Sequence, residues 1–161
     1  MSRRLKYNED AFLSYDVAWF IARKHGIGDI TILRHKVING KECDAVMYGF
    51  TTHKRPRSIG FELKEHDVNK VISQAVLRRK LFHYMYIVTP LELTHFIHIA
   101  HNSGMLYEML KMKIGLIIVK KDERGVFVPT EAYIRSGYNP WPEWRPPKTL
   151  DKFLEEIVLG K

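Results

Sequence analysis

The sequence has little cysteine and no long apolar run. Its single cysteine, Cys43, can form neither an intramolecular disulfide nor a zinc site by itself. The best apolar runs, residues 17–22 and 114–119, are far shorter than the roughly 20 residues of a membrane-spanning helix. The basic N-terminus leads into polar residues, so we expect no secretory signal. These absences favour a cytoplasmic protein that has no membrane partner and is stabilised by its core.

Acidic residues are outnumbered by basic ones. The chain has 18 Asp and Glu against 26 Lys and Arg, which gives a net charge of +8. This excess favours a polyanionic partner such as nucleic acid, with a solvated basic surface as the alternative. A length of 161 residues suits one domain with a single core. We expect one domain over residues 1–161, with a core at about 8–90 and a C-terminal extension at about 91–161.

The spacing of apolar and turn residues predicts an alternation of helices and strands. The expected core elements are a helix at 8–24 capped by Asn8, strands at 30–38, 42–50 and 59–64, a helix at 67–82 capped by Asp67, and a strand at 84–88. The expected later elements are a helix opened by Thr89-Pro90, a short helix ending near 111, a hairpin with strands at 114–119 and 126–128, and a helix at 150–159. The sequence therefore predicts an α/β fold with a mixed sheet, in which the third and fourth strands are parallel and the fourth is central.

One triplet, Glu62-Leu63-Lys64, places two charges on a strand that is otherwise apolar. Side chains alternate along a strand, so Glu62 and Lys64 share one face. Asp44, on the preceding strand, lies opposite this triplet if the hairpin centres near residue 53 or 54. The long loop leaves the register open by one residue. We favour the shared face, because Asp44 opposite Leu63 would be a buried charge without a partner.

Two neighbouring carboxylates and a lysine suit the cleavage of phosphodiester bonds. Asp44 and Glu62 can hold Mg²⁺ or Mn²⁺ while leaving positions for water and phosphate. Such a cation stabilises charge on the phosphate and lowers the pKa of a bound water. Lys64 can orient or deprotonate that water, or neutralise charge at the phosphorus. An ion pair on an exposed sheet face is the alternative interpretation.

These residues resemble the PD-(D/E)xK nuclease superfamily, which has the restriction-endonuclease-like fold. The resemblance covers about residues 8–90 and implies a core of helix, three-stranded meander, helix and strand. It implies that Asp44 and Glu62 are metal ligands and that Lys64 is the catalytic lysine. Cys43 stands where many members have proline.

The resemblance implies two further side chains near the site. Members often place a glutamate on the first helix near the metal, and Glu9 is our choice, with Asp10 and Asp16 as competitors. Many members, including RecB-like nucleases, place a glutamine on the helix after the triplet, facing the active site, and Gln74 matches it. Arg78 stands where the RecB-like pattern has tyrosine.

Basic side chains provide candidates for phosphate contacts. Lys70, Gln74 and Arg78 are four residues apart and form one polar stripe, which either reaches phosphate or is solvated. A second group lies in the loop at 51–58, where it either binds backbone phosphates or keeps the loop soluble: Lys54, Arg55 and Arg57.

Two other motifs indicate less specific roles. His95, His98 and His101 fit the flank of a helix better than a metal site, since no cysteine completes a ligand set. Residues 139–147, rich in Pro and Trp, are interpreted as a stiff strap for the last helix, with base stacking or a subunit contact as alternatives.

We therefore predict a Mg²⁺-dependent nuclease, more specifically an endonuclease, that acts on DNA rather than RNA. One alternative is a catalytically inactive nucleic-acid-binding module on the same fold. Another is a basic assembly adaptor that binds protein through the Pro/Trp segment. A homodimer is left open.

Overall fold

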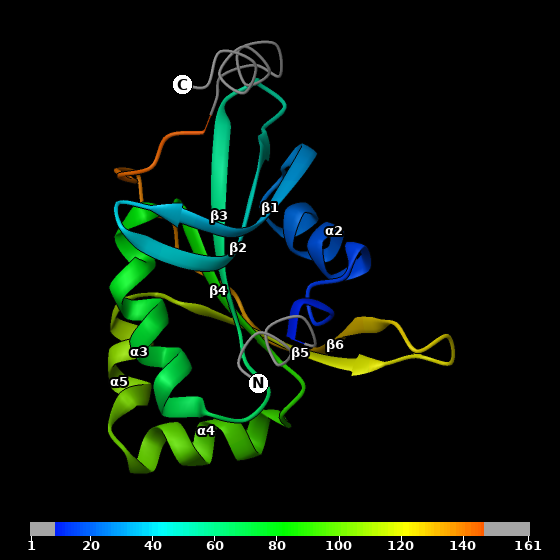
Figure 1. Cartoon of the computed structure of the whole chain (residues 1–161), viewed down its shortest axis with the longest axis vertical. Helices are drawn as coiled ribbons and strands as arrows, with labels where there is room; N and C mark the ends of the chain where they lie inside the picture. Colours follow the sequence, from blue (N-terminus) through cyan, green and yellow to red (C-terminus); the bar gives the residue numbers. More distant parts are fainter. Residues whose placement is uncertain (1–8, 147–161) are drawn as a thin grey trace.

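The computed structural model describes residues 9–146 of the chain. This part contains a six-stranded mixed sheet and four α-helices (Figure 1). The strands are β1 (Gly28–Ile38), β2 (Lys41–Phe50), β3 (Pro56–Leu63), β4 (Tyr84–Thr89), β5 (Gly115–Lys121) and β6 (Phe127–Ile134). The helices are α2 (Tyr15–Lys24), α3 (Val68–Arg78), α4 (Leu93–Asn102) and α5 (Met105–Lys111), with a short 3₁₀ helix, η1 (Arg79–Leu81), after α3. None of the helices between residues 9 and 146 is long and apolar enough to cross a bilayer.

The strands lie in the sheet in the order in which they occur along the chain. β1, β2 and β3 form an antiparallel meander, and β5 and β6 form an antiparallel hairpin. β3, β4 and β5 are mutually parallel. β3 and β4 are parallel because α3 crosses from the end of β3 back to the start of β4. The mixed sheet, the parallel third and fourth strands and the central position of β4 are thereby confirmed. The hairpin at Asn39-Gly40 is confirmed too, with φ of 52° and 77° as its tight turn requires.

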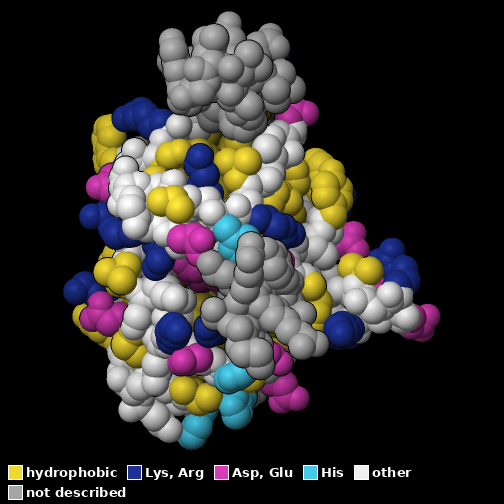
Figure 2. Space-filling view, viewed as in Figure 1, with side chains coloured by type: hydrophobic (Ala, Val, Ile, Leu, Met, Phe, Trp, Pro, Cys, Tyr) yellow, Lys and Arg dark blue, Asp and Glu magenta, His cyan; other side chains and the backbone are white. Residues whose placement is uncertain are grey.

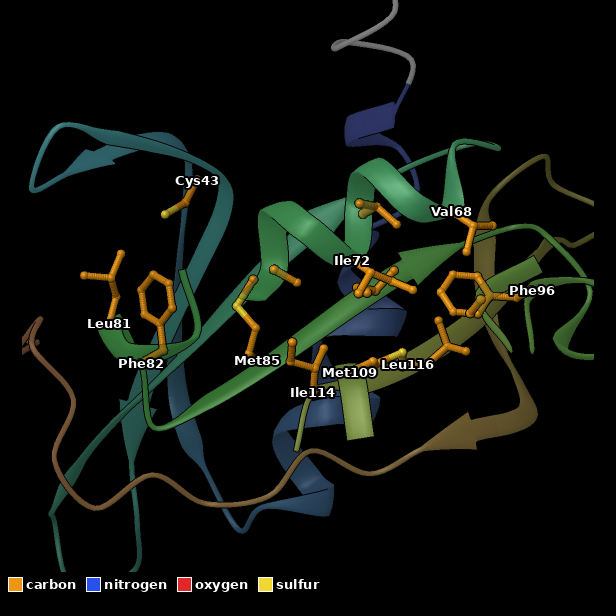
Figure 3. Close-up of a cluster of buried hydrophobic side chains, with 14 of the residues drawn as sticks. Cys43, Val68, Ile72, Leu81, Phe82, Met85, Phe96, Met109, Ile114 and Leu116 are labelled. Atoms are coloured by element: carbon orange, nitrogen blue, oxygen red, sulfur yellow. The ribbon is translucent and has the colours of Figure 1, made fainter. Parts of the chain in front are cut away.

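Helices cover both faces of the sheet. α3, α4 and α5 lie on one face and α2 on the other (Figure 1). On the α3 face, Val68 and Ile72 pack with Met85 of β4 and Phe96 of α4 (Figure 3). On the α2 face, the buried side of that helix packs against apolar residues of β2 to β5. Successive side chains along a central strand therefore point into two separate apolar layers, one on each face of the sheet. A charged side chain that points into either layer is unusual.

The predicted helix at 8–24 is interrupted, because residues 9 and 10 are helical and a turn at 11–13 separates them from the next helix. α2 begins at Tyr15, and Ser14 caps it by accepting a hydrogen bond at Oγ from the Val17 N–H at 3.2 Å. Asn8, the predicted cap, lies outside the described residues. Ser14 Oγ also donates to the Phe127 carbonyl at 2.5 Å, and this tertiary contact joins the start of α2 to β6.

The predicted helix start at Thr89-Pro90 is wrong. Thr89 is the last residue of β4 and pairs with Ile118 of β5, so its backbone belongs to the sheet. α4 begins at Leu93 instead, with Glu92 as its N-cap residue. A central strand extended by one residue thus displaces the helix start by one turn.

The remaining boundaries agree to different degrees with those predicted. Asp67 caps α3, as predicted, through a 3.2 Å bond from the Lys70 N–H to its Oδ1. β3 begins at Pro56, and Leu63 ends it, so Lys64 lies one residue beyond the strand. β6 extends to Ile134, well past the predicted 128. The predicted helix at 150–159 lies outside the described residues.

The Pro/Trp segment lies against the body of the protein. The Trp144 ring contacts the rings of Tyr48 and Phe82 edge-on, at centroid distances of 6.0 and 6.1 Å. The Trp144 N–H donates to the Leu81 carbonyl at 3.0 Å. Trp141, in contrast, is 79% exposed. The strap interpretation agrees with these contacts as far as residue 146.

Two buried histidines link folding to pH. Burial, aided by the Arg135 charge, lowers the pKa of His25 from 6.5 to about 4, and burial similarly lowers the pKa of His83 to about 4. Between pH 6.5 and 4 the unfolded chain therefore binds more protons than the folded one. The histidine contribution to stability is complete above pH 6.5 and is lost as the pH falls toward 4.

His25→Gln is expected to flatten this dependence. His25 Nε2 lies 2.7 Å from Tyr86 Oη, and glutamine retains a hydrogen-bonding group without a titrating ring. Urea unfolding across this pH range should show that proton uptake on unfolding falls by about one proton in the variant. An unchanged pH dependence would mean that His25 titrates alike in both states.

Candidate active site

Asp44 and Glu62 lie on adjacent antiparallel strands at the same level. The β2–β3 pairing runs from Phe50 opposite Pro56 to Ala45 opposite Phe61. Asp44 and Glu62 directly follow the last pair of this ladder, and their carboxyl groups interact. Asp44 Oδ2 also accepts a hydrogen bond from the Leu63 N–H at 2.9 Å. The structure thus has the register that we favoured from the sequence.

Glu62 is a buried acid with an incompletely satisfied carboxylate. The residue is 2% exposed, and its Oε1 lies 3.0 Å from Arg78 Nε. Arg78 Nε directs its hydrogen to the Glu42 carbonyl at 2.9 Å, which leaves its contact with Glu62 electrostatic. Within the described part of the chain, Glu62 Oε1 accepts no hydrogen bond. A buried oxygen of this kind is suited to a further cationic partner.

The environment of Glu62 disfavours its negative charge. Burial raises the pKa of Glu62 well above 4.5, and the neighbouring Asp44 carboxyl raises this pKa further as a like charge and a hydrogen-bond partner. The Arg78 guanidinium and the Asp44 N–H act in the opposite direction but are weaker. Two carboxylates this close either share a proton or bind a cation.

Lys64 and Glu9 lie beside the carboxylate pair. Lys64 is half-buried, directly after β3, and its N–H donates to the Val88 carbonyl at 3.2 Å. Glu9 Oε2 accepts a hydrogen bond from the Glu65 N–H at 3.0 Å. Burial and the Asp44 charge raise the pKa of Glu9, whereas the Lys64 charge lowers it. Glu9 therefore interacts electrostatically with residues from both strands of the site.

The two acids that compete with Glu9 have other partners. Asp10 Oδ2 lies 2.9 Å from His35 Nε2, and Asp16 Oδ2 lies 3.3 Å from Arg124 Nη2. The charges of Asp44 and Lys64 both act on the Glu9 carboxyl and affect its pKa. The positions of Glu9, Asp10 and Asp16 along the chain do not indicate which of the three acids lies near the site.

The polar stripe of α3 contributes one side chain that contacts the pair directly. Arg78 packs inward, since its Nη1 donates to the Gln74 carbonyl at 3.1 Å while its Nε contacts Glu42 and Glu62. Gln74, one turn earlier, is half-buried on the same face, and Lys70 is exposed. Arg78 was selected from the sequence for phosphate binding, and its described contacts are with the protein itself.

The basic residues of the β2–β3 turn lie far from the carboxylates. Lys54 and Arg55 are exposed at the turn, and Arg57 is the second residue of β3. Arg57 and Glu62 are five strand residues apart, which corresponds to about 17 Å. The Arg57 guanidinium lies 5.4 Å from the centre of the Tyr138 ring. This group is therefore separate from the carboxylate site.

Cys43 adjoins the site but is not a candidate nucleophile. Burial, together with the Glu62 charge, raises the pKa of its thiol to about 12. The thiol is therefore protonated at neutral pH, whereas a nucleophilic cysteine must be a thiolate. Its position in the apolar layer under α3 indicates a packing role (Figure 3).

Between residues 9 and 146, no three His, Cys, Asp or Glu side chains are grouped so as to hold a metal ion. His95, His98 and His101 accordingly form no such group on α4. A pair of carboxylates can nevertheless suffice for Mg²⁺, which usually keeps water and phosphate in its other positions. Asp44 and the unsatisfied Glu62 oxygen fit that requirement, with Glu9 nearby.

Comparisons of the chain with protein-family models, curated proteins and solved structures found no match.

Proposed function

We propose that this chain is a metal-dependent nuclease that hydrolyses phosphodiester bonds in nucleic acid, with DNA as the expected substrate. The proposal includes a restriction-endonuclease-like core, based on the order of α2, the β1–β3 meander, α3 and β4. The observation that carries it is the contact of Asp44 with the buried Glu62 and with the Leu63 N–H, followed by Lys64. A structural ion pair on an exposed sheet face would leave Glu62 accessible to water, whereas it is buried.

The two carboxylates would hold Mg²⁺ or Mn²⁺. When bound, the cation stabilises negative charge on the phosphate and lowers the pKa of a water. Asp44 is held in place by the Leu63 N–H, and Glu62 by its contact with Arg78. Glu9 offers a third carboxylate close to this pair.

Lys64 would act on the reacting groups directly. Lys64 is half-buried directly after β3, and its charge acts on the Glu9 carboxyl. From there the ammonium can orient or deprotonate the attacking water, or neutralise charge at the phosphorus. The positive charge of Arg78 would partly offset the negative charge of Glu62.

The test is a cleavage assay with Mg²⁺ or Mn²⁺ against single-stranded, duplex and branched DNA and against RNA. The proposal predicts metal-dependent cleavage that EDTA abolishes. Binding to nucleic acid without cleavage of any of these substrates would support the inactive binding module instead.

Metal binding is expected to strengthen as the pH rises. The raised pKa of Glu62 means that protons compete with the cation until that carboxyl ionises. Calorimetric titration with Mn²⁺ at pH 5.5 and pH 8 should give at least about tenfold tighter binding at the higher pH, as for a site that must release a proton. Equal affinity at both pH values would place the ion away from Glu62.

A further inference from the structure

The net charge of the chain does not by itself locate a binding surface. On the face shown in Figure 2, Lys and Arg side chains are scattered among Asp and Glu side chains. Basic side chains that adjoin exposed aromatic rings are a more specific signal, because together they complement both the phosphates and the bases of a nucleic acid.

The outer face of α2 carries such a combination. We call it the aromatic–basic band, and its members are Tyr15, Trp19, Phe20, Arg23 and Lys24 of α2 and Tyr133 of β6. Tyr15 is 64% exposed and Tyr133 is 37% exposed. Aromatic rings gathered at the surface of one helix indicate an interaction site more often than single exposed residues do.

Cations and rings contact one another along the band. The Arg23 guanidinium lies 6.0 Å from the centre of the Trp19 ring. Lys24 Nζ lies 4.9 Å from the centre of the Phe20 ring and donates a hydrogen bond to Tyr133 Oη at 3.0 Å. These contacts hold the positive charges beside the ring faces instead of leaving them at the ends of freely moving side chains.

The α2 residues of the band line a groove between α2 and the edge strand β6. The groove has a volume of about 790 Å³ and is completed by Val128 and Pro129. Asp16 is the one acidic residue among those lining it, and that carboxylate is paired with Arg124. The uncompensated charge of the lining is therefore positive, and its apolar surface is largely aromatic.

We propose that the aromatic–basic band binds single-stranded nucleic acid, with bases stacked on Tyr15 and Trp19 and phosphates on Arg23 and Lys24. A single strand is favoured over a duplex because its bases are free to stack on protein rings, whereas those of a duplex are stacked on one another. The inference that the band holds the substrate of the carboxylate site rests on the proposed nuclease function. The inference that the band binds single-stranded nucleic acid is independent of that function.

The N-terminal end of the band is near Glu9 along the chain. Glu9 and Tyr15 are six positions apart, so their Cα atoms are at most about 21 Å apart. The start of α2 is fixed to β6 through the bond from Ser14 to Phe127. The carboxylate pair itself lies on the opposite face of the sheet, under α3.

The test measures binding with cleavage prevented. A fluorescein-labelled oligothymidylate of about 16 nucleotides, the upper end of common site sizes, is titrated with the full chain in EDTA, and anisotropy is followed. The test variant is Tyr15→Ala/Arg23→Ser, which removes one exposed ring and one cation. The matched control is Tyr107→Ala/Lys111→Ser on α5, where Tyr107 is 69% exposed and Lys111 Nζ lies 5.9 Å from its ring.

The band variant is expected to bind at least about tenfold more weakly, the scale of losing one stacked base, with the control unchanged. Thermal unfolding of both variants is measured to check that they are folded. Equal losses in the two variants, or tighter binding of a duplex by the parent chain, would overturn the proposal. A dimeric parent that becomes monomeric in the band variant, without weaker binding, would instead make this face an interface between copies.

The outcomes also separate this inference from the proposed function. Binding that depends on the band, without cleavage when Mn²⁺ is added, would retain the binding surface and reject the nuclease. Cleavage by a chain whose affinity is unaffected by the band variant would retain the nuclease and reject the surface.

Discussion

Glu62→Gln is expected to abolish metal-dependent cleavage and to weaken Mn²⁺ binding while the protein stays folded. Glutamine matches the shape of glutamate but removes the charge that the proposed cation binds. Loss of a group that stabilises the charge of the transition state costs about 100-fold or more in rate. The neutral amide removes a buried like-charge repulsion with Asp44 as well as the attraction to Arg78, and because these two effects oppose each other we expect the variant to fold. Cleavage rate, calorimetric Mn²⁺ affinity and thermal unfolding are measured together.

Asp44→Ala should give the same result, since Asp44 is the second proposed ligand. The matched control is Glu143→Gln, which removes an exposed carboxylate that pairs with Lys80 at 3.8 Å, away from the site. The control should cleave like the parent. Full activity in either the Glu62 or the Asp44 variant would reject the metal site proposed at these two residues.

Lys64→Ala is expected to separate catalysis from metal binding. If Asp44 and Glu62 hold the ion, Mn²⁺ affinity should stay nearly unchanged or rise, because a neighbouring positive charge opposes cation binding. Cleavage should still fall by about 100-fold or more, the usual scale for loss of a general base or a charge-stabilising group. Lys64→Arg should not restore activity, because a guanidinium is larger, planar and does not release its proton.

Lys80→Ala is the control for Lys64, because it removes an exposed lysine whose described partner is Glu143. If Lys64→Ala cleaves like the parent, the lysine has no chemical role and the triplet is a structural feature of β3. If it loses Mn²⁺ affinity as well as activity, Lys64 orders the site instead of acting on the phosphate.

The carboxylate site and the band on α2 are separate parts of the molecule. The first is carried by β2 and β3 on the α3 face, whereas the band lies outside α2 and along β6. Variants in one region can therefore be interpreted without strong coupling to the other, since distant substitutions usually act additively.

The sequence by itself determined what depends on neighbours along the chain. Apolar spacing predicted nearly all the described elements, Asn39-Gly40 predicted the first turn, and Asp67 predicted the start of α3. The alternation of side chains on a strand predicted a shared face for Glu62 and Lys64, although β3 ends at Leu63. These features depend on backbone conformations and contacts within a few residues, which local sequence specifies.

Only the tertiary structure decided which distant residues meet. The loop between β2 and β3 is compatible with more than one register, and the pairing of Ala45 with Phe61 brings Asp44 next to Glu62. The acid near Asp44 and Lys64 is Glu9 because the competing acids pair with His35 and Arg124, which are remote in sequence. Arg78 packs inward because a buried carboxylate lies beneath its helix, and Ser14 caps α2 where the chain meets β6. Each outcome depends on burial and charge contributed by other strands and helices, which a pattern along one chain does not contain.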